Sequence, residues 1–312
     1  MKLLYVSSGN SGKINSIVKA QGDSLKEIGI DTSYFLIDGK GIFGYLKNIP
    51  KLRKDLRNSN YDIIHAHYSL SAYVASLAGA KPLVVSLMGS DVKSSGILKM
   101  LVTVFAKYIW NVVIAKSEDM RNTLGIGNIK IIPNGVDIKE FKPLDKFVCQ
   151  KELKWDKDKI HILFAADPER EVKNYALFNE SVRIIKSKNQ KIVVHFLKSI
   201  PHQRMPIFMN AADVVCLTSR WEGSPNVIKE AMACNRPIVS TNVGDVERLT
   251  NGVAGCFVSS MQHSAQYSEQ LQLAIEYSGL HMCSKGRDRI IDLELDAVTT
   301  AKKIRRIYER IA

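Results

Sequence analysis

The chain has 312 residues, of which 46% are hydrophobic and 24% charged, and its formal net charge at pH 7 is +13. This length is long for one domain and comfortable for two, and the composition is that of an ordinary globular protein. No apolar run reaches the roughly 20 residues that a membrane-spanning helix needs. The apolar start of the chain runs straight into a glycine turn without a signal-peptide cleavage pattern, so we expect a cytoplasmic protein.

The cysteines are scattered, odd in number and free of any Cys-x-x-Cys pair. This usage argues against a disulfide framework and against a zinc site. Cys216 and Cys234 lie in apolar contexts and are predicted to be core thiols. The others are Cys149, Cys256 and Cys283.

The first half of the chain predicts strands that alternate with helices. A strand at 3–6 leads through a glycine-containing loop at 7–13 into a helix that ends near residue 28. Short apolar runs that do not alternate are typical of strands buried in a parallel sheet. Such runs predict further strands at 32–37, 63–66, 83–87, 112–115 and 130–132.

A second αβ unit is predicted to follow the segment 141–159, which is rich in Lys and Asp and has little periodicity. Alternation of strands and helical segments favours βαβ units in both halves. The chain ends in a predicted amphipathic helix at 297–312, with an apolar side that includes Ile304 and Ile307. The strands of the second unit are predicted at 161–165, 192–197, 214–217, 238–241 and 255–258.

The segment 219–245 carries the most informative functional pattern. Glu222 and Glu230 flank a Gly-Ser-Pro turn, which lies between a buried strand and a helix predicted at 226–234. The turn therefore lies at the carboxyl end of a strand, where open α/β sheets bind ligands. The free N–H groups and the positive end of the helix favour an anion such as a diphosphate. Alternatively, Glu222 is an ordinary loop acid and Glu230 a solvated helix acid.

The same turn contains Ser224, which could cap the helix, and Pro225, which suits the first helical turn. The whole segment resembles the donor-binding signature of the retaining glycosyltransferases of family 4. Further landmarks fall in the order and spacing of that family. They are Asp-Ile-Ile-His-Ala-His-Tyr at 62–68, Ser-Leu-Met-Gly-Ser-Asp at 86–91, Ile-Pro-Asn-Gly-Val-Asp at 132–137 with Phe141 and Pro143, and Ala-Asp at 212–213.

The resemblance implies the α/β fold called GT-B, in which two Rossmann-like domains face each other across a cleft. It implies an acceptor-side domain at 1–145 and a domain that binds the nucleotide-sugar at 146–296. The helix at 297–312 is expected to cross back to the first domain.

The resemblance also assigns roles at the donor site. Glu230 is expected to accept hydrogen bonds from the nucleotide ribose, and Glu222 to face the donor sugar. The backbone at Gly223, Ser224, Pro225 and Asn226 is expected to line the diphosphate.

Cations are needed because the leaving nucleotide develops charge as the glycosidic bond breaks. Lys173 matches a lysine of the family pattern, whereas Asp167 stands where an arginine is usual. Arg170 is the candidate second cation, or else a surface loop charge. With two cations and a helix end, no metal and no other cofactor is expected, and no cluster of ligand spacing is evident.

On the acceptor side, the resemblance places the loop of Gly9 and Gly12 at the cleft, although a tight strand-to-helix turn is an equally good interpretation. Met88 replaces a histidine that contacts the donor sugar in many members of the family. Asp91 remains as a polar group for the cleft. Of the histidines at 65 and 67, one is expected to be a core residue, and His67 is the better candidate for the cleft.

Two segments of the first half are candidates for contact with a membrane. The segment 45–57 is basic and amphipathic, which suits an anionic membrane surface, but its leucines could equally pack inward. The segment 97–110 is unusually apolar and could deepen such a contact or belong to the core. Nucleic acid is a poor alternative partner, because the basic residues are not interleaved with aromatic ones.

The sequence therefore predicts a retaining glycosyltransferase that moves a sugar from a nucleotide-sugar to a growing glycan or a polyprenyl-linked acceptor, in the manner of polysaccharide, capsule or lipopolysaccharide synthesis. Front-face displacement, which the resemblance implies, needs no protein nucleophile. We expect a cytoplasmic enzyme that is peripheral on the inner face of the membrane. A protein of this fold that binds a nucleotide or glycan without transfer, and a nucleotide-sugar epimerase, are the alternatives.

Overall fold

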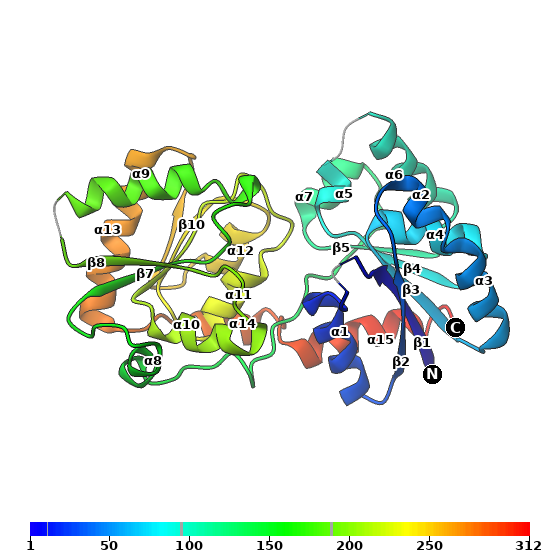
Figure 1. Cartoon of the computed structure of the whole chain (residues 1–312), viewed down its shortest axis with the longest axis horizontal. Helices are drawn as coiled ribbons and strands as arrows, with labels where there is room; N and C mark the ends of the chain where they lie inside the picture. Colours follow the sequence, from blue (N-terminus) through cyan, green and yellow to red (C-terminus); the bar gives the residue numbers. More distant parts are fainter. Residues whose placement is uncertain (11, 94–95, 188–189) are drawn as a thin grey trace. The chain divides into compact units, whose positions relative to one another are not determined.

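The computed structural model describes residues 1–10, 12–93, 96–187 and 190–312. The chain forms two compact units, one of residues 1–135 with 297–312 and the other of residues 136–296. Each unit is built around one parallel sheet with helices on both faces (Figure 1). The pair of parallel α/β units that the sequence predicts is thus confirmed.

The first unit has a six-stranded sheet in the order β2-β1-β3-β4-β5-β6. Alternate residues of a strand point to opposite faces, so Leu4 and Val6 of β1 enter one core and Leu3 and Tyr5 enter the other. The strands are β1 (Lys2–Ser8), β2 (Asp31–Ile37), β3 (Ile63–His67), β4 (Leu83–Ser86), β5 (Val112–Ala115) and β6 (Lys130–Ile131).

Helices α1 and α15 cover one face of this sheet, and α2, α3, α4, α6 and α7 cover the other. Helix α15 packs on α1, with Ile304 and Tyr308 buried. The helices are α1 (Ser16–Glu27), α2 (Gly41–Leu46), α3 (Ile49–Asn58), α4 (Ser69–Ala78), α5 (Ser90–Lys93), α6 (Ile97–Tyr108), α7 (Glu118–Leu124) and α15 (Ala297–Tyr308).

The second unit has a five-stranded sheet in the order β11-β10-β9-β7-β8. Helices α9 and α13 pack on one face, and α10, α11, α12 and α14 pack on the other. The strands are β7 (Ile160–Phe164), β8 (Ile192–Phe196), β9 (Val214–Leu217), β10 (Ile238–Thr241) and β11 (Cys256–Ser259). The helices are α8 (Lys146–Leu153), η1 (Glu171–Lys173), α9 (Tyr175–Lys186), η2 (His202–Arg204), α10 (Met205–Ala211), α11 (Asn226–Ala233), α12 (Val246–Thr250), α13 (Ser264–His281) and α14 (Gly286–Asp292).

The second unit begins at Val136, earlier than the sequence indicates. Phe141 is 1% exposed in its core, and Arg287 of α14 donates hydrogen bonds to the carbonyl oxygens of Ile138 (2.7 Å) and Phe141 (2.9 Å). These bonds attach residues 136–145 to the second unit, although the segment is polar and aperiodic in sequence.

Candidate functional site

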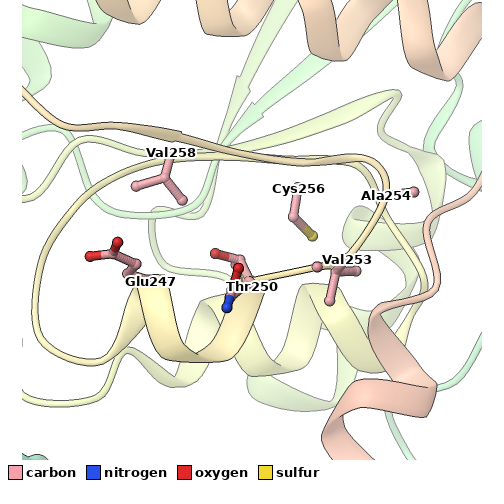
Figure 2. A pocket seen from close by; sticks show the side chains of 8 residues that line it. Glu247, Thr250, Val253, Ala254, Cys256 and Val258 are labelled. Carbon is pink, nitrogen blue, oxygen red and sulfur yellow. The ribbon is translucent and has the colours of Figure 1, made fainter.

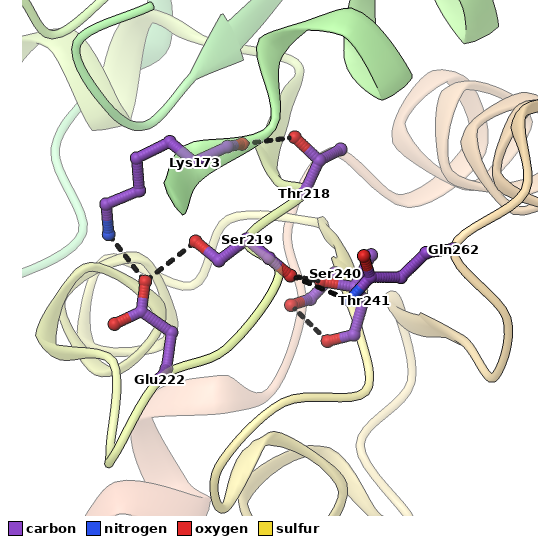
Figure 3. Close-up of polar contacts among 7 residues, drawn as sticks. All are labelled: Lys173, Thr218, Ser219, Glu222, Ser240, Thr241 and Gln262. Atoms are coloured by element: carbon purple, nitrogen blue, oxygen red, sulfur yellow. Dashed lines mark hydrogen bonds and ion pairs between the residues drawn. The ribbon is translucent and has the colours of Figure 1, made fainter. Parts of the chain in front are cut away.

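The candidate site lies where β9 ends and α11 begins, at the carboxyl edge of the second sheet. Lys173 and Glu222 meet there, with 2.5 Å between Nζ and Oε1, and Ser219 Oγ donates to the same carboxylate oxygen at 2.7 Å (Figure 3). Lys173 is 12% exposed and Glu222 18%, so the ion pair is largely shielded from water. The structure therefore brings together two of the residues that the sequence singled out.

Hydrogen bonds from neighbouring strands and loops hold the backbone of this segment. Thr218 Oγ1 donates to the carbonyl oxygen of Lys173 at 2.9 Å, and Thr241 Oγ1 of β10 donates to that of Ser219 at 2.8 Å (Figure 3). Gln262 Nε2 reaches the carbonyl oxygens of Ser219 (3.3 Å) and Arg220 (3.0 Å). The segment that carries Glu222 is thus fixed from both sides.

Ser224 does not cap α11, contrary to the expectation from sequence. The N-cap of α11 is Pro225, which makes no side-chain capping bond. Ser224 Oγ instead donates to Asp245 Oδ2 at 2.9 Å, and Lys229 Nζ donates to Ser224 Oγ at 3.2 Å. The Ser224 hydroxyl therefore joins the ammonium of Lys229, from which it accepts, to the carboxylate of Asp245, to which it donates.

Glu230 is 8% exposed, so it is not the solvated helix acid of the alternative interpretation. His202 of η2 lies with Nε2 3.3 Å from Glu230 Oε1 and Nδ1 3.8 Å from Glu140 Oε1. The hydrogen bond with Glu230 raises the pKa of His202 against the opposing effect of burial. Sequence reasoning missed His202 and Glu140. His202 follows the end of β8, at the same sheet edge as the end of β9, and this position could have indicated it as a site residue.

Arg170 and Asp167 lie on the loop that precedes η1. Arg170 is exposed, and the structure does not bring its side chain to Glu222. Asp167 Oδ1 accepts a hydrogen bond from the amide of Glu169 at 3.0 Å, which stabilises the turn. Asp167 therefore shapes the loop in the structure, and the role of Arg170 stays a prediction.

In the first unit, the residues proposed for the cleft have structural contacts. Gly9 donates its N–H to the carbonyl oxygen of Ile37 at 2.8 Å, and Gly12 has a φ of +71° in a turn onto Gly9. Ser11, in the same loop, lies outside the described residues.

Asp91 is 3% exposed and accepts hydrogen bonds from the amides of Ser69, Met88 and Gly89. Its carboxylate thus joins the loops that follow β3 and β4.

His67 is 4% exposed and stacks on His65 with 4.5 Å between ring centroids. Within the described part of the chain, neither of its buried ring nitrogens has a hydrogen-bond partner. Burial, with a smaller contribution from Lys116, lowers the pKa of His67 to about 3, so the ring is neutral. His65 bonds Tyr308 (2.6 Å) and Ser86 (2.9 Å), as expected for a satisfied core histidine.

A separate pocket of about 520 Å³ lies between α12 and β11 (Figure 2). It is lined by Glu247, Thr250, Asn251, Gly252, Val253, Ala254, Cys256 and Val258, none of which belongs to the predicted donor site.

Among residues 1–10, 12–93, 96–187 and 190–312, no three His, Cys, Asp or Glu side chains form a group that could hold a metal ion. Over the same ranges, no helix is long and apolar enough to cross a membrane.

Comparison with known proteins identifies the class. Residues 147–276 match the family described as glycosyl transferases group 1, and residues 17–140 match glycosyltransferase family 4. The chain belongs to these group 1 and family 4-like glycosyltransferases, with the GT-B fold.

Two bacterial relatives align over most of the chain. It is 23% identical to the UDP-Gal:alpha-D-GlcNAc-diphosphoundecaprenol alpha-1,3-galactosyltransferase of Escherichia coli, over 84% of this chain and 79% of the relative. It is 27% identical to the N,N'-diacetylbacillosaminyl-diphospho-undecaprenol alpha-1,3-N-acetylgalactosaminyltransferase of Campylobacter jejuni, over 86% and 82%.

Solved structures support the fold. The sucrose-phosphate synthase of Thermosynechococcus elongatus superposes with a TM-score of 0.78 at 15% identity, over 99% of this chain and 98% of that one. Anabaena HepE in complex with UDP and glucose gives a TM-score of 0.77 at 18% identity, over 99% of both chains.

Proposed function

We propose that this enzyme transfers a sugar, with retention of configuration, from a nucleoside-diphosphate sugar to a sugar carried on a polyprenyl diphosphate. The meeting of Lys173, Glu222 and Ser219 beside the start of α11 carries the proposal. The names of the E. coli and C. jejuni relatives, which both specify a diphosphoundecaprenol-linked acceptor, support the choice of acceptor.

The donor diphosphate binds against the turn of Gly223, Ser224, Pro225 and Asn226. Lys173 neutralises it, and Glu222 orients the Lys173 ammonium and faces the donor sugar. Glu230 accepts hydrogen bonds from the ribose. Its buried carboxylate suits this role, because a charged acceptor in a site shielded from water makes strong hydrogen bonds.

The reaction needs no protein nucleophile. The bond between the anomeric carbon and the phosphate oxygen breaks, and the acceptor hydroxyl forms the new bond on the same face of the sugar. The proton of that hydroxyl passes to the leaving phosphate. Lys173 stabilises the charge that develops on the leaving group, an interaction that is stronger in the transition state than in the ground state.

An anionic membrane surface is the second partner in the proposal, because a polyprenyl acceptor resides in the bilayer. On α3, Leu52 is buried and Ile49 and Leu56 pack against the core, so the leucines of α3 face inward. An apolar surface that suits a bilayer lies on α6. Ile97, Met100, Val104 and Tyr108 form an exposed stripe on that helix, with exposures of 71%, 58%, 42% and 70%.

The positive charge around α6 suits contact with an anionic membrane surface. Lys99 and Lys107 accompany the stripe, and no acidic residue occurs in the sequence between Asp91 and Glu118. Lysines next to an apolar helical face are attracted by anionic lipids while the apolar side chains enter the acyl boundary.

The test of the function is a transfer assay with a radiolabelled sugar and an extracted lipid acceptor. We expect label to move from a nucleotide-sugar into the lipid phase. Nucleotide binding without transfer would support the non-catalytic alternative. Conversion of the free nucleotide-sugar into its epimer, with no label in the lipid, would support the epimerase.

A further inference from the structure

Lys229 of α11 is fully buried, with an exposed fraction of 0%. A lysine ammonium is costly to remove from water unless charged or polar partners compensate it. Lys229 Nζ donates to Ser224 Oγ at 3.2 Å, and Asp245 and Glu230 are the carboxylates that act on its charge. A buried cation one residue before Glu230 therefore reaches back to the turn at the start of its own helix.

Ser224 connects this cation to Asp245, which lies at the N-cap of α12 and is 7% exposed. Ser224 Oγ donates to Asp245 Oδ2 at 2.9 Å, and Arg248 lies 3.6 Å from the same oxygen. In the described part of the chain, Asp245 Oδ1 is buried without a hydrogen-bond partner. Lys229 is the main charged group that offsets the cost of burying the Asp245 carboxylate.

The backbones of the two turns also touch. Gly244 has a φ of +61°, and a Cβ built on it would lie 2.4 Å from the carbonyl oxygen of Gly223. Only glycine fits at 244, since any side chain would collide with backbone. The turn after β10 thus packs closely against the turn after β9, and the hydrogen bond of the Ser224 hydroxyl to Asp245 joins them.

We propose that Lys229 and Asp245 are positioning residues, which hold Ser224 between them and so fix the donor turn, residues 222–226, in the shape that receives a nucleoside diphosphate. The inference rests on the proposed function, because the turn has a ligand only if the donor binds there. Preorganised backbone donors bind and stabilise a diphosphate better than mobile ones do, since no ordering cost arises on binding.

Affinity for a diphosphate should depend on pH through the charge of Lys229. Burial lowers the pKa of Lys229 to about 8, with Asp245 and Glu230 opposing the shift and Arg248 adding to it. Diphosphate affinity should therefore weaken as the pH rises through about 8, when the ammonium loses its charge. The same decline should be absent from Lys229→Met, which has no charge to lose.

The experiment compares wild type with Lys229→Met, Asp245→Asn and Ser224→Ala. Lys146→Met is the matched control, because Lys146 pairs with Asp213 (2.7 Å) at the amino end of β9, away from the donor turn. Amide hydrogen exchange of residues 219–228 is measured without nucleotide, and affinity for UDP, GDP and ADP is measured from pH 6.5 to about 9.5, a range set to span the loss of the Lys229 charge.

We expect faster exchange of residues 219–228 in the three test variants and about tenfold weaker affinity for the nucleotide that wild type binds. The control should match wild type in both. Unchanged exchange in Ser224→Ala and in whichever charge variants fold would overturn the positioning role. Failure of wild type to bind any of the three nucleotides would overturn the donor site, and the exchange result would still report on the turn by itself.

Discussion

At the scale of single residues, charged side chains from separate elements meet around the donor turn. Lys173 from η1 pairs with Glu222, and His202 from η2 pairs with Glu230. Each contact joins residues that are distant in sequence, and each includes one of the two glutamates of the signature. Removal of one partner leaves the other charge partly buried and without its counter-charge. Substitution of Lys173 should therefore change turnover, and substitution of His202 should change stability.

Lys173→Ala should lower turnover by about 100-fold and weaken donor binding less, because the lost charge acts mostly on the leaving group in the transition state. Arg170→Ala should show the same pattern more weakly, since Arg170 is exposed on its loop. Steady-state kinetics with a saturating acceptor separate the two effects. If both variants behave like wild type, the donor does not bind at this edge, and the enzyme mechanism given above is wrong.

His202 should make stability depend on pH. Its folded pKa is raised above the ordinary value near 6.5, so its contact with Glu230 stabilises the fold fully below that value. The contribution is lost as the pH rises through the folded pKa. His202→Gln should therefore lower the melting temperature by about 1–3 °C at pH 5.5 and by less at pH 8.5. An equal loss at both pH values would show that His202 acts only by packing.

At the scale of elements, the exposed stripe of α6 is the feature that the donor chemistry does not explain. The inner side of α6 contributes Val102 and Ala106 to the core of the first unit, so the helix is already anchored on that side. An apolar outer side then remains, flanked by lysines, as in helices that lie in a membrane interface.

Met100→Glu with Tyr108→Glu should reduce co-sedimentation with vesicles that contain phosphatidylglycerol by about tenfold, because two new charges would enter the acyl boundary. Vesicles of phosphatidylcholine alone should bind wild type weakly. Leu280→Glu is the control, since Leu280 is an exposed apolar residue of α13 in the other unit, with an exposure of 80%. Undiminished binding by the α6 variant would show that another surface meets the lipid.

At the scale of the whole molecule, each unit contains a parallel sheet covered on both faces, and we propose that the sugar-nucleotide chemistry belongs to the second unit. The proposed neutralisation of the diphosphate uses side-chain cations and a helix N-terminus from that unit alone. Excess EDTA should therefore leave turnover within about twofold of the untreated enzyme, a range well below the change that loss of a catalytic metal causes. Loss of activity on chelation, restored by Mg²⁺ or Mn²⁺, would contradict this mechanism.

The sequence alone was sufficient to predict the strands and the paired α/β units. An apolar run such as 214–217 is buried in any arrangement that forms a sheet, so its pattern is local and visible in sequence. The segment proposed to bind the donor was visible for the same reason, because the strand, the turn and the first residues of α11 are consecutive. Glu222 and Glu230 were identified from that local order.

Side-chain partners, by contrast, were decided by the tertiary structure. Ser224 has the sequence context of a helix cap, yet its hydroxyl bonds Asp245, which reaches it from the turn after the next strand. Lys229 looks like a surface lysine in sequence and is buried. His202 became a neighbour of Glu230 only because β8 and β9 end at one sheet edge. Hydrogen bonds and ion pairs depend on distances of a few ångströms between remote segments, and local sequence patterns do not encode those distances.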